Sequence, residues 1–154
     1  MEPTPAMQEI PQPAPLPTIL IVDDNEPTAK ALAKVLRSAN FNTAVTFRGA
    51  DAIEYAANNP IAAAVVDIHL PDLNGLVVTQ KLRERLGPAT PIIILSGDTS
   101  METLNSLPQV GATYFFSKPV NATELVARMH EWVDGNDRIR NLNDPSTSSG
   151  QANQ

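Results

Sequence analysis

The chain has 154 residues, of which 42% are hydrophobic and 18% charged, a composition typical of one globular domain with a hydrophobic core. Its formal net charge of −6 disfavours nucleic-acid binding through a basic face, so we expect no DNA partner. The absence of cysteine excludes disulfides and thiolate metal sites and favours a cytoplasmic location. The apolar runs are far shorter than the roughly 18 residues of a membrane span, so we expect no membrane insertion.

Composition divides the chain into three parts. Residues 1–17 hold six of the 14 prolines, and we interpret this segment as a Pro-rich disordered tail because little of it can join a core. Residues 135–154 contain a glycine, a proline and a Ser/Thr cluster, and we interpret them as a disordered tail or linker. Residues 18–134 are therefore expected to form the one folded domain.

Apolar runs alternate with helix-period segments inside this domain. We predict strands near 18–23, 42–47, 62–67, 91–95 and 113–117. We predict helices from about Pro27, over 50–58, from about Asn74 to the Gly87–Pro88 stop, within 100–110, and after an Asn121 cap. Pro108 removes a backbone hydrogen bond from the fourth helix, which we expect to be short or kinked near this residue.

Three of the predicted strands are almost continuously apolar. This pattern is typical of a parallel sheet that is covered on both faces. Five strand–helix units with right-handed crossovers then predict a doubly wound α/β domain with a five-stranded parallel sheet. In such sheets ligands bind outside the carboxyl ends of the strands, which makes that edge the place to look for a site.

Polar residues stand at the carboxyl ends of four predicted strands: Asp23 and Asp24, Asp67, Ser96 and Lys118. Three clustered carboxylates need a compensating cation, and ligands that are all oxygen favour a hard ion, Mg²⁺ first. Lys118 suits the role of counter-charge to a phosphoryl oxygen, and Ser96 can donate to another. Such a group is suited to phosphoryl transfer onto an aspartate.

Four segments of the chain resemble the receiver domain of two-component response regulators, over about residues 18–134. They are Ile-Leu-Ile-Val-Asp23-Asp24-Asn25-Glu26, Val-Val-Asp67-Ile-His-Leu-Pro71-Asp-Leu-Asn-Gly75, Ile-Ile-Leu-Ser96-Gly97 and Phe115-Phe-Ser-Lys118-Pro119. The resemblance implies a flavodoxin-like fold with strand order 2-1-3-4-5 and five helices.

The resemblance also implies a phosphorylation site with Mg²⁺ as its cofactor. Asp67 would be the phospho-acceptor, and Asp23 and Asp24 would bind Mg²⁺ with it. The backbone carbonyl of His69 would be a further metal ligand. Lys118 would pair with the phosphoryl group, and its peptide bond to Pro119 would be cis.

The resemblance implies a switch of two residues. Ser96 would move to the phosphoryl group, and Phe115 would follow into the vacated space. Tyr is frequent in the family at the position of Phe115, so the loss of the hydroxyl is a departure that bears on how the switch is read by a partner.

Taken together, these residues predict a phosphorylation-dependent signalling switch rather than an enzyme, limited to self-catalysed phosphotransfer and autodephosphorylation. A sensor histidine kinase or a histidine phosphotransfer protein would donate the phosphoryl group. No output domain follows residue 134, so the chain is either a stand-alone receiver, for which we expect signalling through a downstream protein target, or a fragment of a longer protein. We expect a monomer or a weak phosphorylation-dependent dimer.

Other functions stay open on the sequence. A pseudo-receiver that is never phosphorylated would act as an interaction or dimerisation module. A metal-dependent phosphatase is disfavoured because its Asp-x-Asp pair and cap insertion are missing. A nucleotide or flavin domain is disfavoured because the turn after the first strand lacks a Gly-rich phosphate cradle.

Overall fold

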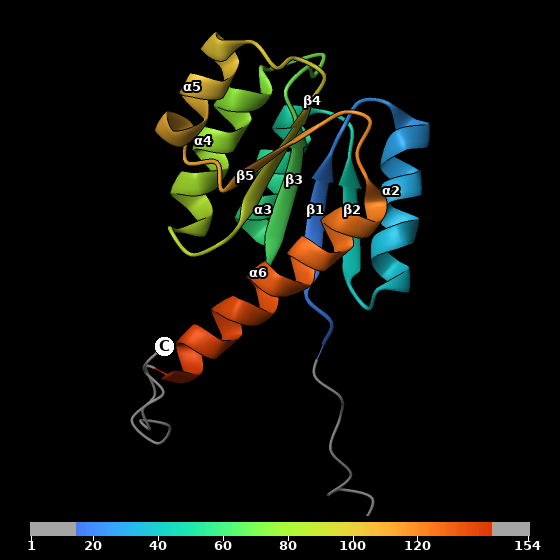
Figure 1. The fold of residues 1–154 in the computed structure, drawn as a ribbon, viewed down its shortest axis with the longest axis vertical. Coiled ribbons are helices and arrows are strands. Elements are labelled where there is room, and N and C mark those ends of the chain that lie inside the picture. Colours follow the sequence, from blue (N-terminus) through green and yellow to red (C-terminus); the bar gives the residue numbers. More distant parts are fainter. Residues whose placement is uncertain (1–14, 143–154) are drawn as a thin grey trace, which may run out of the picture.

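A computed structural model describes residues 15–142 of the chain (Figure 1). Its strands are β1 (Thr18–Val22), β2 (Asn42–Thr46), β3 (Ala63–Asp67), β4 (Ile92–Ser96) and β5 (Tyr114–Ser117). Its helices are α2 (Glu26–Ser38), α3 (Gly49–Asn58), α4 (Gly75–Leu86), α5 (Met101–Val110) and α6 (Ala122–Leu142). All strand pairs are parallel, and the order β2-β1-β3-β4-β5 confirms the predicted doubly wound sheet.

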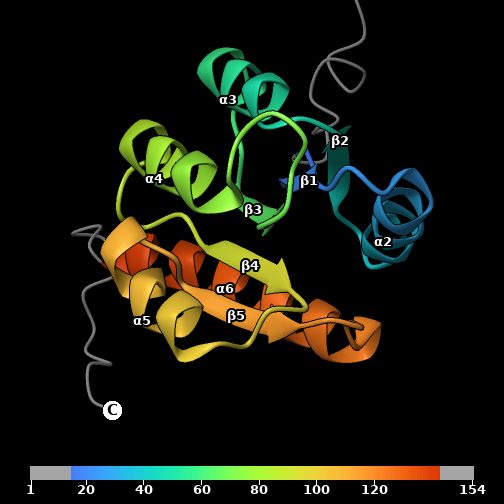
Figure 2. The same ribbon diagram turned by 90° about the horizontal axis from the view of Figure 1, so that it is seen from above.

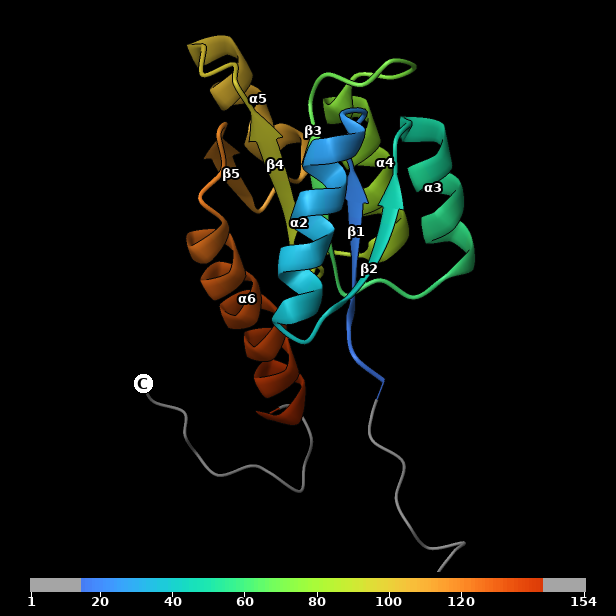
Figure 3. The same ribbon diagram turned by 90° about the vertical axis from the view of Figure 1, so that its right-hand side faces the viewer.

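Helices cover both faces of the sheet (Figures 1 and 3). On one face, alternate strand residues such as Ile19 and Ile21 pack with α2 and α6. On the other face, Leu20 and Val22 pack with α3, α4 and α5. Successive side chains of a strand point to opposite faces, so a strand buried on both sides needs an unbroken apolar run.

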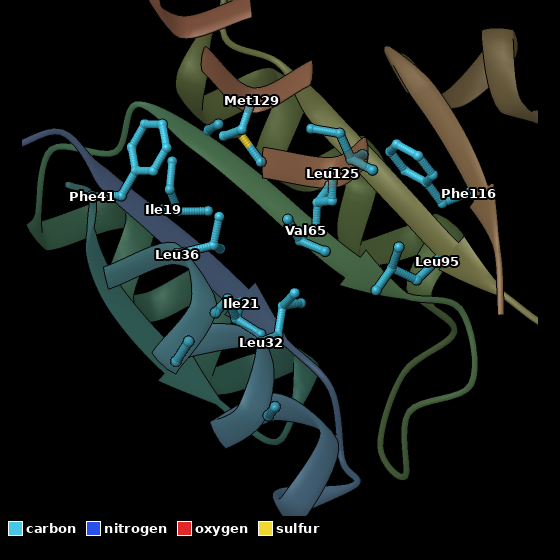
Figure 4. Packing of buried hydrophobic residues seen from close by; sticks show 14 of the residues in the cluster. Ile19, Ile21, Leu32, Leu36, Phe41, Val65, Leu95, Phe116, Leu125 and Met129 are labelled. Atoms are coloured by element: carbon cyan, nitrogen blue, oxygen red, sulfur yellow. The ribbon is translucent and has the colours of Figure 1, made fainter. Parts of the chain in front are cut away.

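The core under α2 and α6 is closely packed (Figure 4). Ile19 of β1 lies against Leu36 of α2, while Leu125 and Met129 of α6 lie over Val65 of β3. The solvent-exposed fraction of each of these side chains is 1% or less. Burying one side chain of this size contributes about 2 kcal/mol, so this layer stabilises the frame that carries the strand ends.

Side-chain caps fix where several helices begin. The side chains of Asn25, Asn74, Ser100 and Asn121 accept hydrogen bonds from backbone N–H groups in the first turns of α2, α4, α5 and α6. A cap satisfies N–H groups that have no partner inside the helix. Because each helix follows a parallel strand, these caps lie at the end of the sheet where the strands end.

The helix α5 departs in part from the prediction. It is ten residues long and continues past Pro108 to Val110, so the proline does not end it. Pro108 lies in the last turn, where only one intrahelical bond is lost. Gly111 ends the helix in the left-handed conformation, with φ 87°. A kink at Pro108 stays a prediction.

The C-terminal helix corrects the predicted end of the ordered segment. We predicted a disordered tail from residue 135, but α6 continues to Leu142 and its last turns extend beyond the sheet (Figures 1 and 3). Gly135 costs a helix only about 1 kcal/mol, and the first proline after it is Pro145. The tail predictions for 1–14 and 143–154 lie outside the described residues. Within 15–142, no helix is long and apolar enough to cross a membrane.

Candidate phosphorylation site

The polar residues predicted for the site meet at one edge of the sheet. Val22 of β1 pairs with Val66 of β3, so Asp23 and Asp67 follow in neighbouring strands. Asp67 in turn pairs with Leu95, one residue before Ser96. The parallel register therefore brings together residues that are far apart in the sequence, as the sequence predicted.

Three carboxylates form the acidic part of this site. Ligand oxygens of Asp23, Asp24 and Asp67 lie within 4.8 Å of one another. Asp23 and Asp67 are buried, with exposed fractions of 2% and 5%, whereas Asp24 faces solvent. The N–H of Asn25 donates to Asp23 Oδ1 at 2.9 Å and fixes the direction of that carboxylate.

The ammonium group of Lys118 lies beside two of these carboxylates. Its Nζ donates to Asp67 Oδ2 at 3.0 Å and lies 3.5 Å from Asp23 Oδ2. The Lys118–Pro119 peptide bond is cis, as predicted. The ammonium group therefore bridges the two buried carboxylates.

Burial and the neighbouring charges shift the pKa values of Asp23 and Lys118. Burial raises the pKa of the Asp23 carboxyl, and the neighbouring Asp67 adds to this, although the N–H of Asn25 and the charge of Lys118 oppose it. Burial alone would lower the pKa of the Lys118 ammonium. Its hydrogen bond to Asp67 and the charge of Asp23 outweigh burial and raise that pKa. The lysine therefore carries its charge at neutral pH.

The acidic cluster suits a hard divalent cation. Asp23 Oδ2 is buried among the described residues without a hydrogen-bond partner, although Lys118 lies within ion-pair distance. A buried carboxylate oxygen that lacks a donor is costly unless a cation approaches it. Mg²⁺ is bound in proteins through oxygen ligands, with carboxylates supplying part of its shell and waters or phosphate oxygens the rest. The residues present therefore fit Mg²⁺.

The remaining predicted residues surround the cluster. The N–H of His69 donates to Asp67 Oδ1 at 3.2 Å, and the His69 side chain is exposed. Ser96 is fully buried, and its hydroxyl oxygen accepts a hydrogen bond from the N–H of Asp98 at 2.9 Å. Phe115 is half-buried on the face of α3, α4 and α5, whereas Phe116 points to the α6 face. The assigned roles of these residues stay predictions.

Two residues of the segment that follows β3 were not singled out from the sequence. Gly75 opens α4 so close to β3 that a Cβ there would overlap the carbonyl oxygen of Asp67. Asp72 is not one of the three clustered carboxylates, but its carboxylate accepts hydrogen bonds from the N–H groups of Gly49 and Ala50. Both lie in the segment from Val65 to Gly75 that carries the family resemblance, but that pattern does not show which atoms they approach.

Comparison with known proteins places this arrangement in a family. The sequence matches the response regulator receiver domain over residues 19–130. The chain belongs to this family. Receiver domains are parts of two-component signalling systems, are generally phospho-acceptors rather than enzymes in their own right, and bind Mg²⁺ at an acidic aspartate cluster.

Relatives of the receiver domain include two regulators of the photosynthetic apparatus, both named RegA. The chain is 39% identical to RegA of Cereibacter sphaeroides over 108 residues, 70% of this chain and 58% of that protein. It is 36% identical to RegA of Rhodovulum sulfidophilum over 113 residues, 73% of this chain and 61% of that protein. The chain thus spans less than two thirds of either relative.

A solved CheY-like receiver domain from Methanospirillum hungatei has the same fold. Its TM-score to this chain is 0.76 at 26% sequence identity, and the match covers 80% of this chain and 98% of the other. The predicted fold class is therefore confirmed both by the sheet order and by this structural likeness.

Proposed function

We propose that this receiver domain is a phosphorylation-dependent switch whose phospho-acceptor is Asp67. The proposal rests on one observation above all. Asp67 Oδ2 contacts the Lys118 ammonium at 3.0 Å beside two further carboxylates. A fixed cation at that oxygen offsets the charge that an incoming phosphoryl group brings.

The donor would be a phosphohistidine of a sensor histidine kinase or of a histidine phosphotransfer protein. A carboxylate oxygen of Asp67 attacks the phosphorus in line. An O–P bond forms while the P–N bond breaks, and the electron pair of that bond stays on the imidazole nitrogen. Water then attacks the phosphorus of the acyl phosphate, the bond between phosphorus and the Asp67 oxygen breaks, and inorganic phosphate leaves. The Asp67 carboxylate is thereby regenerated, which completes the self-catalysed cycle.

The chain's own residues prepare this step. Asp23, Asp24 and Asp67, with the His69 backbone carbonyl, would hold Mg²⁺, which supplies positive charge to the phosphoryl oxygens when bound. Lys118 contacts the acceptor directly, through a hydrogen bond to Asp67 Oδ2. It orients the Asp67 carboxylate and stabilises the charge that develops during transfer.

Ser96 and Phe115 would carry the signal away from the site. The Ser96 hydroxyl already accepts from Asp98, so its proton can be donated to a phosphoryl oxygen. A shift of Ser96 toward that oxygen opens space on the face where Phe115 packs with residues of α5. Phe115 can move inward there, with no hydroxyl to bond to a partner.

We propose that the output is binding to a downstream protein, from a monomer or a weak phosphorylation-dependent dimer. The net charge of −6 supports a protein target over DNA. The cysteine-free composition supports a cytoplasmic location. Membership of the receiver family supports a histidine kinase or a histidine phosphotransfer protein as the phosphoryl donor.

Labelling with acetyl phosphate tests the proposal directly. The wild-type chain with Mg²⁺ is expected to gain the mass of one phosphoryl group, and chelation of the metal should prevent the gain. Asp67→Asn should gain nothing, while Asp51→Asn, which removes an exposed aspartate of α3, should label like wild type. Failure of the wild type to label would instead support a pseudo-receiver that works as an interaction module.

A further inference from the structure

We propose that Asp72 is a positioning residue for the metal site, because it holds the loop between β3 and α4 against α3 and thereby sets the affinity for Mg²⁺. This inference rests on the proposed function, which assigns His69, in the same loop, a metal-binding carbonyl. Asp72 itself belongs to no candidate ligand set. Its effect would pass through the loop that it anchors.

The contacts of Asp72 tie two distant segments together. Its Oδ1 accepts from the N–H of Gly49 at 2.8 Å, and its Oδ2 accepts from the N–H of Ala50 at 2.9 Å. These N–H groups lie in the first turn of α3, where the helix itself offers them no acceptor. Arg48, at the N-cap position of α3, makes no side-chain cap bond. Asp72 therefore supplies, from another loop, the cap that the sequence of α3 lacks.

The charge of Asp72 strengthens this anchor. The hydrogen bonds from Ala50 and Gly49 hold the pKa of the Asp72 carboxyl below its ordinary value, so the group is ionised at neutral pH. A carboxylate at a helix N-terminus also interacts favourably with the helix dipole. Bonds of an ionised acceptor are stronger than those between neutral groups.

The loop that carries Asp72 is closed at its base beside the acceptor. The N–H of Gly75 donates to the carbonyl of Ile68 at 2.7 Å, and His69 and Asn74 form an antiparallel bridge. The N–H of His69 donates to Asp67. The loop thus has a base that includes His69 and a tip that includes Asp72, and Figure 2 shows it arching beside α3. A tether at the tip restrains the backbone at the base.

Packing at Gly49 keeps the loop and α3 in contact without the carboxylate. A Cβ at Gly49 would lie 3.2 Å from atoms of the Leu73 side chain and 2.6 Å from Val78 Cγ2. The loop and helix therefore touch through apolar atoms as well as through Asp72. Loss of the carboxylate should loosen the loop rather than detach it, so its effect on metal affinity should exceed its effect on folding.

The decisive measurement is the affinity for Mg²⁺ of Asp72→Asn, determined by isothermal titration and by competition with Mn²⁺ observed through paramagnetic broadening. The substitution keeps the size of the side chain and replaces one acceptor oxygen by an amide NH₂. We expect the Kd for Mg²⁺ to rise about tenfold, as is usual when the partners that orient metal ligands are removed. Hydrogen exchange at the Gly49 and Ala50 amides should accelerate in the same variant.

Two control variants distinguish the loss of a positioning contact from the loss of a negative charge and from a general loss of stability. Asp51→Asn removes the same unit charge from the first turn of α3 and should leave the Kd close to wild type. Arg83→Ala lowers stability at the far end of the sheet and should also bind Mg²⁺ normally. If Asp72→Asn does not fold, Asp72→Ser, which keeps one cap acceptor, is measured in its place.

The outcomes distinguish this inference from the proposed function. Wild-type protein that binds no Mg²⁺ overturns both. Wild-type protein that binds Mg²⁺ while the Asp72 variant matches Asp51→Asn overturns the positioning role alone and leaves the phosphorylation site intact. An equal loss of affinity in Arg83→Ala would also overturn it, because general destabilisation would then explain the effect.

Discussion

Gly75 is the position where one added carbon should disturb the site most. It opens α4, and its backbone lies against the strand end that carries the expected acceptor. A Cβ there would overlap the carbonyl oxygen of Asp67 and would lie 2.5 Å from the Cα of Ile68 and 2.9 Å from the carbonyl carbon of Asp67. These neighbours are backbone atoms, so Gly75→Ala cannot be absorbed by turning a side chain.

The cost of Gly75→Ala follows from two opposing effects. Forcing a methyl into a packed region costs about 1–3 kcal/mol, and a clash with backbone belongs at the upper end. Replacing glycine by alanine in a helix stabilises the folded state by about 0.5–1 kcal/mol, because alanine loses less conformational entropy on folding. We therefore expect the free energy of unfolding to fall by about 2 kcal/mol, which lowers the Tm by roughly 8 °C for a domain of this size.

Urea unfolding followed by tryptophan fluorescence measures this change. Trp132 is the only tryptophan of the chain, and its ring lies 5.2 Å from the ring of Tyr114, so its emission should report on the packing of α6. Gly135→Ala is the matched control. It makes the same chemical change in α6, where a Cβ meets nothing within 4 Å, and should stabilise the protein by about 0.5–1 kcal/mol.

A Gly75→Ala variant as stable as wild type, alongside a Gly135→Ala variant that behaves as expected, would contradict this prediction. In that case α4 could move away from β3 at little cost. The close approach at Asp67 would then not be a constraint on the fold.

Three further predictions concern the charged groups. Lys118→Met should retain Mg²⁺ binding but slow labelling by acetyl phosphate about a hundredfold, as for loss of one transition-state donor; an unchanged rate contradicts its role. Because burial raises the folded-state pKa of Asp23 above the unfolded 3.8, its contribution to the free energy of unfolding falls as pH rises through that folded-state pKa. Metal-free Asp23→Asn should therefore gain stability relative to wild type as the pH rises from 3.8 through the folded-state pKa of Asp23. A difference in the free energy of unfolding that stays constant with pH in urea titrations would refute this. Arg83 donates hydrogen bonds to the carbonyls of Gly87, Thr90 and Gly111. Arg83→Ala should therefore lower the free energy of unfolding by about 2 kcal/mol. Labelling by acetyl phosphate at the wild-type rate checks that the substitution leaves the site unchanged.

Much of the fold was predictable because its signals are local. Unbroken apolar runs require burial on both faces, and this predicted a parallel sheet covered by helices. Asn74 and Asn121 marked helix starts because short polar side chains cap helices. The end of α6 was predicted too early, because Gly135 was taken as a stop although its cost is small in a helix that continues beyond it.

For the site, the sequence by itself determined which chemical groups stand at the strand ends. Asp23, Asp67 and Lys118 each follow an apolar run, and parallel pairing can bring such ends to only one edge. The expectation of a cis bond before Pro119 and of an acidic cluster depended on these local patterns and on the family resemblance they carry.

Only the tertiary structure decided how these groups are held. The 3.0 Å contact between Lys118 and Asp67, the 3.5 Å ion pair between Lys118 and Asp23 and the anchoring of Asp72 on α3 join residues from different segments. Their distances depend on strand register and helix packing, which no local pattern encodes. The physical reason is that a local sequence determines which groups a segment presents, whereas close packing of distant segments determines the spacing between them.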